Sequence, residues 1–442
     1  NRSSLGVGLG AVQEIPVLRA SGRVEEARRL ADVAYTTNTL TCLIYAAGLV
    51  AWALWRAPFL DGDPLAAEWT WGLVAVAGLT LVKRYESFLV AVLRAHREFT
   101  LTAELDVVES LVSAGVVGLG LWLAGFWGLL VAVGVLLIVK IAYAHARHPF
   151  RFRWRWEVPT AWRLMRVGLP ILMTTALHGA LLSVDRVVIL SRFPDGARAA
   201  GLYSIALAGT GWALDLSGRI VQVVYNAFQT TLGRTNDPAE VARQAARTTE
   251  AQAPPLLAGS AGAYLAGPSL LGLLMPRYAE GLPALRPLLP GMTLISLAWP
   301  CRQFLIAVGQ PYRLGLATVL GLLVTTYAAI AGADAAGLVG LAWGVSLGFT
   351  TTFLVTNGVA LVPWLGWTRW LKHMLRIGLT TIVVTLATLV VTHVPLGLTD
   401  PWIDLTVRVG ALGAGSLTWL AFWGRRHGWG GLLKGRGGSR DA

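Results

Sequence analysis

Long apolar stretches recur along the chain and are separated by short polar segments. Between Thr36 and Trp423 the apolar runs are about twenty residues long, which is the length an α-helix needs to cross a bilayer core. Because the polar segments between these runs are short, we expect no separate soluble domain. The pattern predicts membrane spans at 36–56, 69–92, 103–124, 127–146, 167–190, 201–228, 253–275, 284–308, 313–332, 336–358, 375–394 and 402–423.

Composition supports this interpretation. Of the 442 residues, 55% are hydrophobic and 14% are charged, whereas a soluble domain carries about 25% charged residues. The formal net charge of +13 could indicate nucleic acid, but the basic residues lie in short segments between apolar runs. We therefore expect an all-α, polytopic membrane bundle that does not bind nucleic acid.

Charges in the polar segments predict the orientation of the chain. Basic residues are concentrated in alternate loops, which the positive-inside rule places in the cytoplasm together with the C-terminal tail. The opposite loops carry only Arg56, Arg192, Arg198, Arg277 and Arg286. The loops predicted to be cytoplasmic include Arg23, Arg28, Arg29, Arg94, Arg97, Arg151, Arg153, Arg155, Arg163, Arg166, Arg234, Arg243, Arg247, Arg302, Arg313, Arg369, Lys372 and Arg376.

Two local similarities suggest an internal repeat. The segment GRVEEAR at 22–28 is similar to GR at 233–234 followed by EVAR at 240–243, and FWGLL at 126–130 is similar to AAGLV at 335–339. Both pairs are six spans apart, an even number, which predicts two six-helix lobes related by a pseudo-two-fold axis along the membrane normal. The segment before Arg19 matches the end of span 201–228, so we expect a further helix before Asn1.

The predicted organisation follows from this repeat. It comprises an N-terminal lobe at 1–146, a basic cytoplasmic linker at 147–166, a C-terminal lobe at 167–358, two additional helices at 375–423 and a basic cytoplasmic tail at 424–442.

Polar residues inside the spans are the candidate functional residues, because ionised groups in the bilayer cost free energy and usually face a bundle interior or a cavity. In span 201–228, Asp215, Arg219, Gln222 and Asn226 follow helical spacing and share one face. Asp215 and Arg219 are one turn apart and can pair.

Two further spans carry mixed charge. Span 167–190 holds His178 and Asp185, seven residues apart and so expected on one face, with Arg186 beside them. Span 69–92 holds Lys83, Arg84 and Glu86. These groups either line a water-filled cavity or pair with one another inside the bundle. His178 can be a hydrogen-bonded interior residue or a proton relay.

Motifs for catalysis or metal binding are absent from the sequence. There is no HExxH, Walker A, paired CxxC or GxSxG pattern in a suitable context, and Cys42 and Cys301 lie far apart in apolar runs. We expect no catalytic residue, metal or cofactor.

Several segments together resemble the polysaccharide (O-antigen type) flippase family of the multidrug/oligosaccharidyl-lipid/polysaccharide exporter superfamily. They are GLPIL at 168–172, VDRVVI at 184–189, GLYSIA at 201–206, AVGQP at 307–311 and AGLVG at 336–340. The resemblance implies two six-helix lobes that move an undecaprenyl-diphosphate-linked oligosaccharide across the bacterial cytoplasmic membrane by alternating access. It also implies a cationic cavity in which Arg219 holds the lipid diphosphate, while Asp185 and Asp215 orient Arg219 or bind a coupling ion, H⁺ or Na⁺.

Two other functions fit the same residues less well. A multidrug antiporter of the same superfamily would use Asp185, Asp215 and Glu86 for cations. A membrane ligase or polymerase of polysaccharide assembly would need Arg and His clustered on an outer loop, and the outer loops here are short. The partners expected for the leading hypothesis are the lipid-linked oligosaccharide, membrane lipids and a coupling ion.

Overall fold

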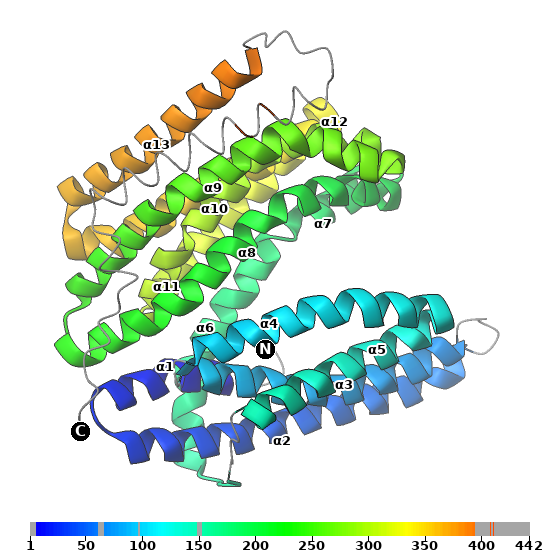
Figure 1. Cartoon of the computed structure of the whole chain (residues 1–442), viewed down its shortest axis with the longest axis vertical. Helices are drawn as coiled ribbons and strands as arrows, with labels where there is room; N and C mark the ends of the chain where they lie inside the picture. The colour runs from blue at the N-terminus through cyan, green and yellow to red at the C-terminus, as the bar shows by residue number, and fades with distance from the viewer. Residues whose placement is uncertain are drawn as a thin grey trace. The chain divides into compact units, whose positions relative to one another are not determined.

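The computed structural model describes residues 6–60, 66–95, 98–147 and 153–393, together with Val407 and Gly410. Every regular element in these residues is helical, which confirms the predicted all-α class (Figure 1). The elements are α1 (Val7–Ala20), α2 (Val24–Arg56), η2 (Ala57–Leu60), α3 (Ala66–Ala95), α4 (Phe99–Val112), η3 (Ser113–Val117), α5 (Gly118–Arg147), α6 (Val158–Leu181), α7 (Val184–Arg192), α8 (Gly196–Thr235), α9 (Pro238–Leu274), η4 (Pro276–Ala284), α10 (Leu285–Leu297), α11 (Trp299–Ala307), α12 (Pro311–Leu365) and α13 (Trp367–His393).

Each predicted span except the last falls within these helices, although two of them are interrupted. Span 167–190 breaks after Leu181 into α6 and α7, and span 284–308 breaks at Ala298 into α10 and α11. Span 402–423 apart from Val407 and Gly410, the tail at 424–442 and linker residues 148–152 lie outside the described residues.

Many large apolar side chains on the helix surfaces are exposed, as a membrane protein requires. Ile44, Trp122 and Tyr327 are among them, at 73%, 80% and 79% exposure. Six stretches of helix in the described residues are long and apolar enough to cross a bilayer. The chain is therefore a multi-pass membrane protein.

The chain divides into two compact units. Unit 1 is Asn1–Thr175 with Gln229–Asn236, and unit 2 is Ala176–Phe228 with Asp237–Ala442. The unit boundaries run through α6 and α8, so each of these helices contributes to both units.

The core of unit 1 is built on close helix approach. Leu30 and Ala34 of α2 pack against α1 and against Phe88 of α3. A side chain at Gly10 of α1 would overlap the carbonyl of Leu164 in α6, so glycine permits the two backbones to approach.

The core of unit 2 joins α7, α8, α10 and α12 around Tyr203, Leu288 and Phe349, which are almost fully buried. A second cluster joins α8, α9 and α13. Helix α13 packs against α9 and α12 (Figure 1).

Helices α5 and α12 each contain one sharp reversal of the backbone, and the two reversals have nearly the same dihedral angles. Gly125 has φ 54° and ψ −131°, and Gly337 has φ 58° and ψ −140°. In both hairpins, the glycine three residues after the reversal packs on the glycine five residues before it. These pairs are Gly128 with Gly120 and Gly340 with Gly332. The spans on either side of each reversal therefore form a helical hairpin.

This geometry corrects the register of the repeat. The sequence comparison matched Gly128 with Gly337, whereas equal backbone conformation matches Gly125 with Gly337 and Gly128 with Gly340. Likewise, the left-handed residues that precede α2 and α9 are Gly22 (φ 81°) and Asn236 (φ 49°), not Gly22 and Gly233. Both corrected matches lie three residues from the positions that the sequence comparison paired, and the division into two six-helix lobes stays a prediction.

Candidate functional site

Asp215, Arg219, Gln222 and Asn226 form a polar stripe along α8, and contacts on the opposite side of the helix set its direction. The buried Ser217 hydroxyl lies 2.7 Å from both the Gln252 side-chain oxygen of α9 and the backbone oxygen of Ser296 in α10. These contacts fix the rotation of α8 in unit 2. As a result Asp215 and Arg219, which are two residues from Ser217 on either side, are exposed.

The other two residues of the stripe lie one and two turns further along α8. Gln222 is exposed, and Asn226 is 9% exposed with its side-chain amide donating to the Gln222 carbonyl at 3.2 Å. The four residues of the stripe therefore lie on one unbroken helix at the predicted spacing. Pairing of Asp215 with Arg219 stays a prediction.

The residues of span 167–190 are not arranged as predicted. Because the helix breaks at Leu182 and Ser183, His178 belongs to α6 and Asp185 to α7, so the single helical face expected for the two was wrong. Asp185 is 2% exposed, and its carboxylate accepts the backbone N–H of Arg186 at 2.8 Å in the first turn of α7. The Arg186 side chain is exposed.

In unit 1, Glu86 and Lys83 of span 69–92 belong to an ion-pair network across three helices, centred on the buried pair of Glu86 and Lys140. Glu86 of α3 accepts from Lys140 of α5 at 2.6 Å and from Lys83 at 2.9 Å. Lys140 also pairs with Glu109 of α4. The Lys140 and Glu86 side chains are 4% and 5% exposed, so this network is interior pairing. Arg84, on the same helix, is buried as well.

Lys140 and Glu109 were not among the predicted residues. Lys140 is the only Lys, Arg, Asp or Glu in predicted span 127–146, and Glu109 is one of three acidic residues in span 103–124, so the criterion that selected Glu86 would have found both. Charges in different spans can meet only in the folded bundle, and their pairing cannot be read from spacing along one helix.

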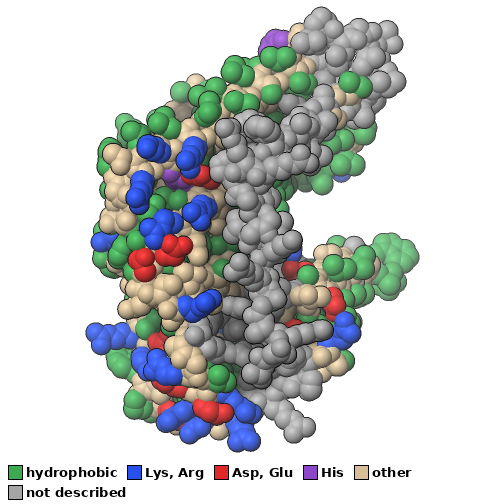
Figure 2. Space-filling model, turned by 60° about the vertical axis from the view of Figure 1, so that its left-hand side comes forward, with side chains coloured by type: hydrophobic (Ala, Val, Ile, Leu, Met, Phe, Trp, Pro, Cys, Tyr) green, Lys and Arg blue, Asp and Glu red, His purple; other side chains and the backbone are tan. Residues whose placement is uncertain are grey.

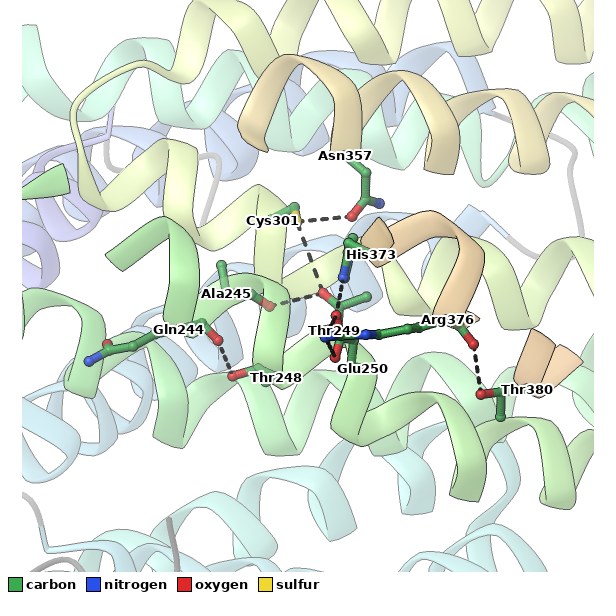
Figure 3. Close-up of polar contacts among 10 residues, drawn as sticks. All are labelled: Gln244, Ala245, Thr248, Thr249, Glu250, Cys301, Asn357, His373, Arg376 and Thr380. Atoms are coloured by element: carbon green, nitrogen blue, oxygen red, sulfur yellow. Dashed lines mark hydrogen bonds and ion pairs between the residues drawn. The ribbon is translucent and has the colours of Figure 1, made fainter. Parts of the chain in front are cut away.

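Unit 2 holds a second buried network that the sequence analysis missed (Figure 3). Glu250 of α9 lies 2.9 Å from the Nδ1 atom of His373 and 3.1 Å from an Arg376 nitrogen, both on α13. Glu250 and His373 are almost fully buried, whereas the Arg376 side chain is 63% exposed. Helices α9 and α13 begin well before spans 253–275 and 375–394, so Glu250 and His373, which lie outside the predicted spans, lie within helices.

Beside this network, Cys301 joins three helices. Its thiol donates to the side-chain oxygen of Asn357 in α12 at 3.1 Å and lies 4.0 Å from the Thr249 hydroxyl of α9 (Figure 3). Cys301 is fully buried and acts here as a packing residue with one polar contact. Its neighbour Arg302, assigned above to a cytoplasmic loop, is also buried in α11.

Charged side chains outside the spans form a network at one end of unit 1. Glu157, just before α6, lies 2.8 Å from Arg29 and 2.7 Å from Arg155. The hydrogen bond from Arg29 lowers the pKa of Glu157. Asp32 and Thr36 of α2 accept the backbone N–H groups of Arg153 and Arg155, at 3.1 and 2.9 Å, so Arg153–Glu157 is fixed on α2.

Lys and Arg side chains gather on the face turned toward the viewer in Figure 2, with Asp and Glu among them. Among the described residues there is no group of three or more His, Cys, Asp or Glu side chains that could hold a metal ion.

Comparison with known proteins gives the fold and the family. None of the curated proteins compared with the chain matches it. Solved structures of MATE transporters match at low sequence identity and show that the fold is shared. The Vibrio cholerae transporter VcmN in its bent form has 16% identity and a TM-score of 0.62, with 86% of each chain covered.

Two related structures give the same result. A point mutant of VcmN has 16% identity and a TM-score of 0.66, covering 85% of this chain and 86% of that one. An outward-facing multidrug resistance MATE transporter of the MOP superfamily has 15% identity and a TM-score of 0.61, covering 86% and 85%.

A family model described as polysaccharide biosynthesis protein matches residues 20–263, more than half of the chain. This match, over a fold shared with transporters of the MOP superfamily, confirms the resemblance drawn from the motifs. The chain belongs to the polysaccharide biosynthesis protein family.

Proposed function

We propose that this protein is a flippase that moves an undecaprenyl-diphosphate-linked oligosaccharide across the cytoplasmic membrane by alternating access, for cell-surface polysaccharide biosynthesis. The observation that carries the proposal is the stripe on α8. Helix α8, which contains predicted span 201–228, exposes Asp215, Arg219 and Gln222 on one side, while Ser217 fixes its other side to α9 and α10. Membership of a polysaccharide biosynthesis family supports it.

The physical task explains why such a stripe is useful. A sugar–diphosphate head cannot cross the hydrocarbon core unaided at a useful rate, because charged and hydroxyl groups lose their hydration there. Exposed polar side chains can replace part of that hydration while the polyprenyl tail stays in lipid. A guanidinium matches two phosphate oxygens at once, so Arg219 would hold the diphosphate.

The acidic residues have a separate role in this proposal. Asp215, one turn from Arg219, would orient the guanidinium or bind a coupling ion, H⁺ or Na⁺. The buried Asp185 at the start of α7 would serve the same end. We further propose that the alternate loops rich in basic residues and the C-terminus face the cytoplasm, as the positive-inside rule predicts.

Antiport of organic cations is the second candidate. It is favoured by the fold shared with multidrug transporters and by the exposed carboxylate of Asp215. In that case Asp215 and Asp185 would carry the cation or the coupling ion, and Arg219 would repel the substrate.

A transport assay separates the two candidates. The full chain is reconstituted in proteoliposomes, and the flipping of a fluorescent polyprenyl-diphosphate oligosaccharide is compared with the uptake of ethidium. The proposal predicts protein-dependent flipping of several glycan types and no ethidium transport. Ethidium transport with no flipping by well-folded protein would replace the flippase proposal with cation antiport.

A further inference from the structure

Arg302 is a buried cation in unit 2 that lacks an acidic partner among the residues that the structure describes. It lies in the first turn of α11 and is 5% exposed. Its Nη1 atom is buried without a hydrogen-bond partner. Lys140 of unit 1 is buried to a similar degree but contacts two carboxylates, Glu86 and Glu109.

Two other side chains with unpartnered donors surround this guanidinium. The Arg302 guanidinium carbon lies 5.7 Å from the centre of the Trp299 ring, one turn earlier in α11. The imidazole of His178 in α6 meets the same ring edge-on, at 6.0 Å between ring centres. His178 is 6% exposed, and both of its nitrogens and the Trp299 indole nitrogen are buried without partners.

The contacts present do not offset the burial of this charge. A desolvated cation–π contact recovers only part of the hydration that a buried guanidinium loses. The unpaired Nη1 atom adds a further penalty, because a buried donor without a partner keeps its full desolvation cost. Water could satisfy the donors, but it would supply no opposite charge.

The three side chains share one chemical property. Arg302 and Trp299 can only donate hydrogen bonds, and His178 can donate from one or both nitrogens. They lie where α6 ends and α11 begins, and the start of a helix carries partial positive charge from its unsatisfied N–H groups. A group that accepts several hydrogen bonds and carries negative charge would satisfy all of them.

We propose that His178, Trp299 and Arg302 form a binding site for a small anion, with phosphate-type oxygens as the preferred ligand. Arg302 supplies the charge and a fork that fits two phosphate oxygens, Trp299 supplies its indole N–H, and His178 supplies an imidazole N–H. The ligand is either a free inorganic anion or the diphosphate of a lipid. The site does not depend on the proposed transport activity, because binding is measured without transport.

Binding of radiolabelled inorganic pyrophosphate to the full chain in detergent tests the proposal directly. Equilibrium dialysis at constant ionic strength, with gluconate as the replacing anion, should show saturable binding to one site. Arg302→Met should weaken this binding by at least tenfold, and His178→Ala should weaken it less. Absence of saturable binding to the wild-type protein overturns the proposal without recourse to any variant.

Arg286 provides a matched control in the same unit. It also stacks on an aromatic ring, 4.9 Å from the centre of Tyr264, but it is exposed. Arg286→Met should bind pyrophosphate like the wild type, and equal losses in Arg286→Met and Arg302→Met would contradict a specific site.

The source of the anion is resolved by competition. Displacement of pyrophosphate by polyprenyl diphosphate assigns the site to a lipid headgroup, and displacement only by free phosphate assigns it to a soluble ion. Thermal unfolding gives an independent check, because a ligand that binds the folded state raises the melting temperature. Pyrophosphate should raise the melting temperature of the wild type and Arg286→Met but not of Arg302→Met, and an equal rise in all three would overturn the proposal.

Discussion

At the scale of single residues, the interior of this protein shows how a bundle accommodates charge. Glu86 and Lys140 pair inside unit 1, and Glu250 and His373 pair inside unit 2. Breaking such a pair is costly because it leaves an uncompensated charge away from water. The two networks therefore hold helices together, whereas Asp215 and Arg219 of α8 are exposed.

The Lys140 network gives the first prediction. Lys140→Met leaves Glu86 with the half-exposed Lys83 as its cationic partner, so the free energy of unfolding should fall by about 3 kcal/mol. Thermal unfolding of the purified variant measures this loss. Lys83→Met is the control and should change stability little, because its side chain is 51% exposed.

A double variant tests the reason for that loss. Adding Glu86→Gln to Lys140→Met removes the stranded carboxylate as well, and should restore part of the melting temperature. No recovery in the double variant would mean that the packing of Lys140, not its charge, is what stabilises unit 1.

The second residue-scale prediction concerns Glu157. The hydrogen bond from Arg29 lowers its pKa below the ordinary value of 4.5 in the folded protein. Glu157 therefore stabilises the fold above pH 4.5, and this contribution is lost as the pH falls through the lower, folded-state pKa. The melting temperatures of wild type and Glu157→Gln should differ at pH 7 and converge as the pH is lowered below 4.5. A difference that stays unchanged over the whole acid range in which the protein remains folded would contradict this assignment.

At the scale of elements, the two hairpins depend on paired glycines with different tasks. Gly337 combines a positive φ with ψ −140°, a conformation largely confined to glycine, and has open space where a side chain would lie, so Gly337→Ala incurs only the backbone penalty, about 1–3 kcal/mol. Gly340 faces the backbone of Gly332, and a side chain there would overlap the Gly332 carbonyl.

Gly340→Ala should therefore destabilise the protein more than Gly337→Ala does, because the two arms of the hairpin must separate. The expected loss in the free energy of unfolding for Gly340→Ala is about 3 kcal/mol or more. The yield and melting temperature of fluorescent fusions in membranes compare the two variants. The same order is expected for Gly128→Ala and Gly125→Ala in α5, since the geometry repeats. If alanine is equally tolerated at Gly337 and Gly340, the close approach of the hairpin arms is wrong.

Helix α13 gives the second element-scale prediction. Because Glu250 contacts both His373 and Arg376, Glu250→Gln should weaken the attachment of α13 to α9. Hydrogen exchange should become faster in Trp367–His393 while Leu285–Leu297 of α10 stays unchanged. Glu280→Gln is the control, since its pair with Arg198 is largely exposed. Uniform acceleration across unit 2 would argue against a local attachment.

At the scale of the whole molecule, the sequence predicts helices better than contacts. Apolar runs predicted the spans because bilayer thickness sets their length. The breaks at Ser183 and Ala298 were missed because hydropathy does not distinguish one helix from two short ones in line. The repeat was visible in glycines, but its register required the positive φ values at Gly125 and Gly337.

The candidate residues divide into those on a single helix, which could be predicted, and those that meet between helices, which could not. The stripe of Asp215, Arg219, Gln222 and Asn226 could be predicted because it lies on one unbroken helix. Networks such as Glu250 with His373 join residues distant in sequence. Arg302 was counted with the cytoplasmic loop charges although it lies within predicted span 284–308, and only the packing of α11 shows that it is buried. Helical spacing therefore predicts faces, and packing between helices decides which charges meet.

The central claim is that Arg219 on α8 binds the diphosphate of a lipid-linked oligosaccharide during transport. The most direct measurement is the rate at which proteoliposomes flip a fluorescent polyprenyl-diphosphate oligosaccharide, with wild type, Arg219→Ala and Arg286→Ala compared at equal folded protein. A lost charge-assisted contact of about 1.5–3 kcal/mol predicts a roughly tenfold to hundredfold slower rate for Arg219→Ala. Arg286→Ala should flip like the wild type. Undiminished flipping by Arg219→Ala would contradict the assignment of Arg219.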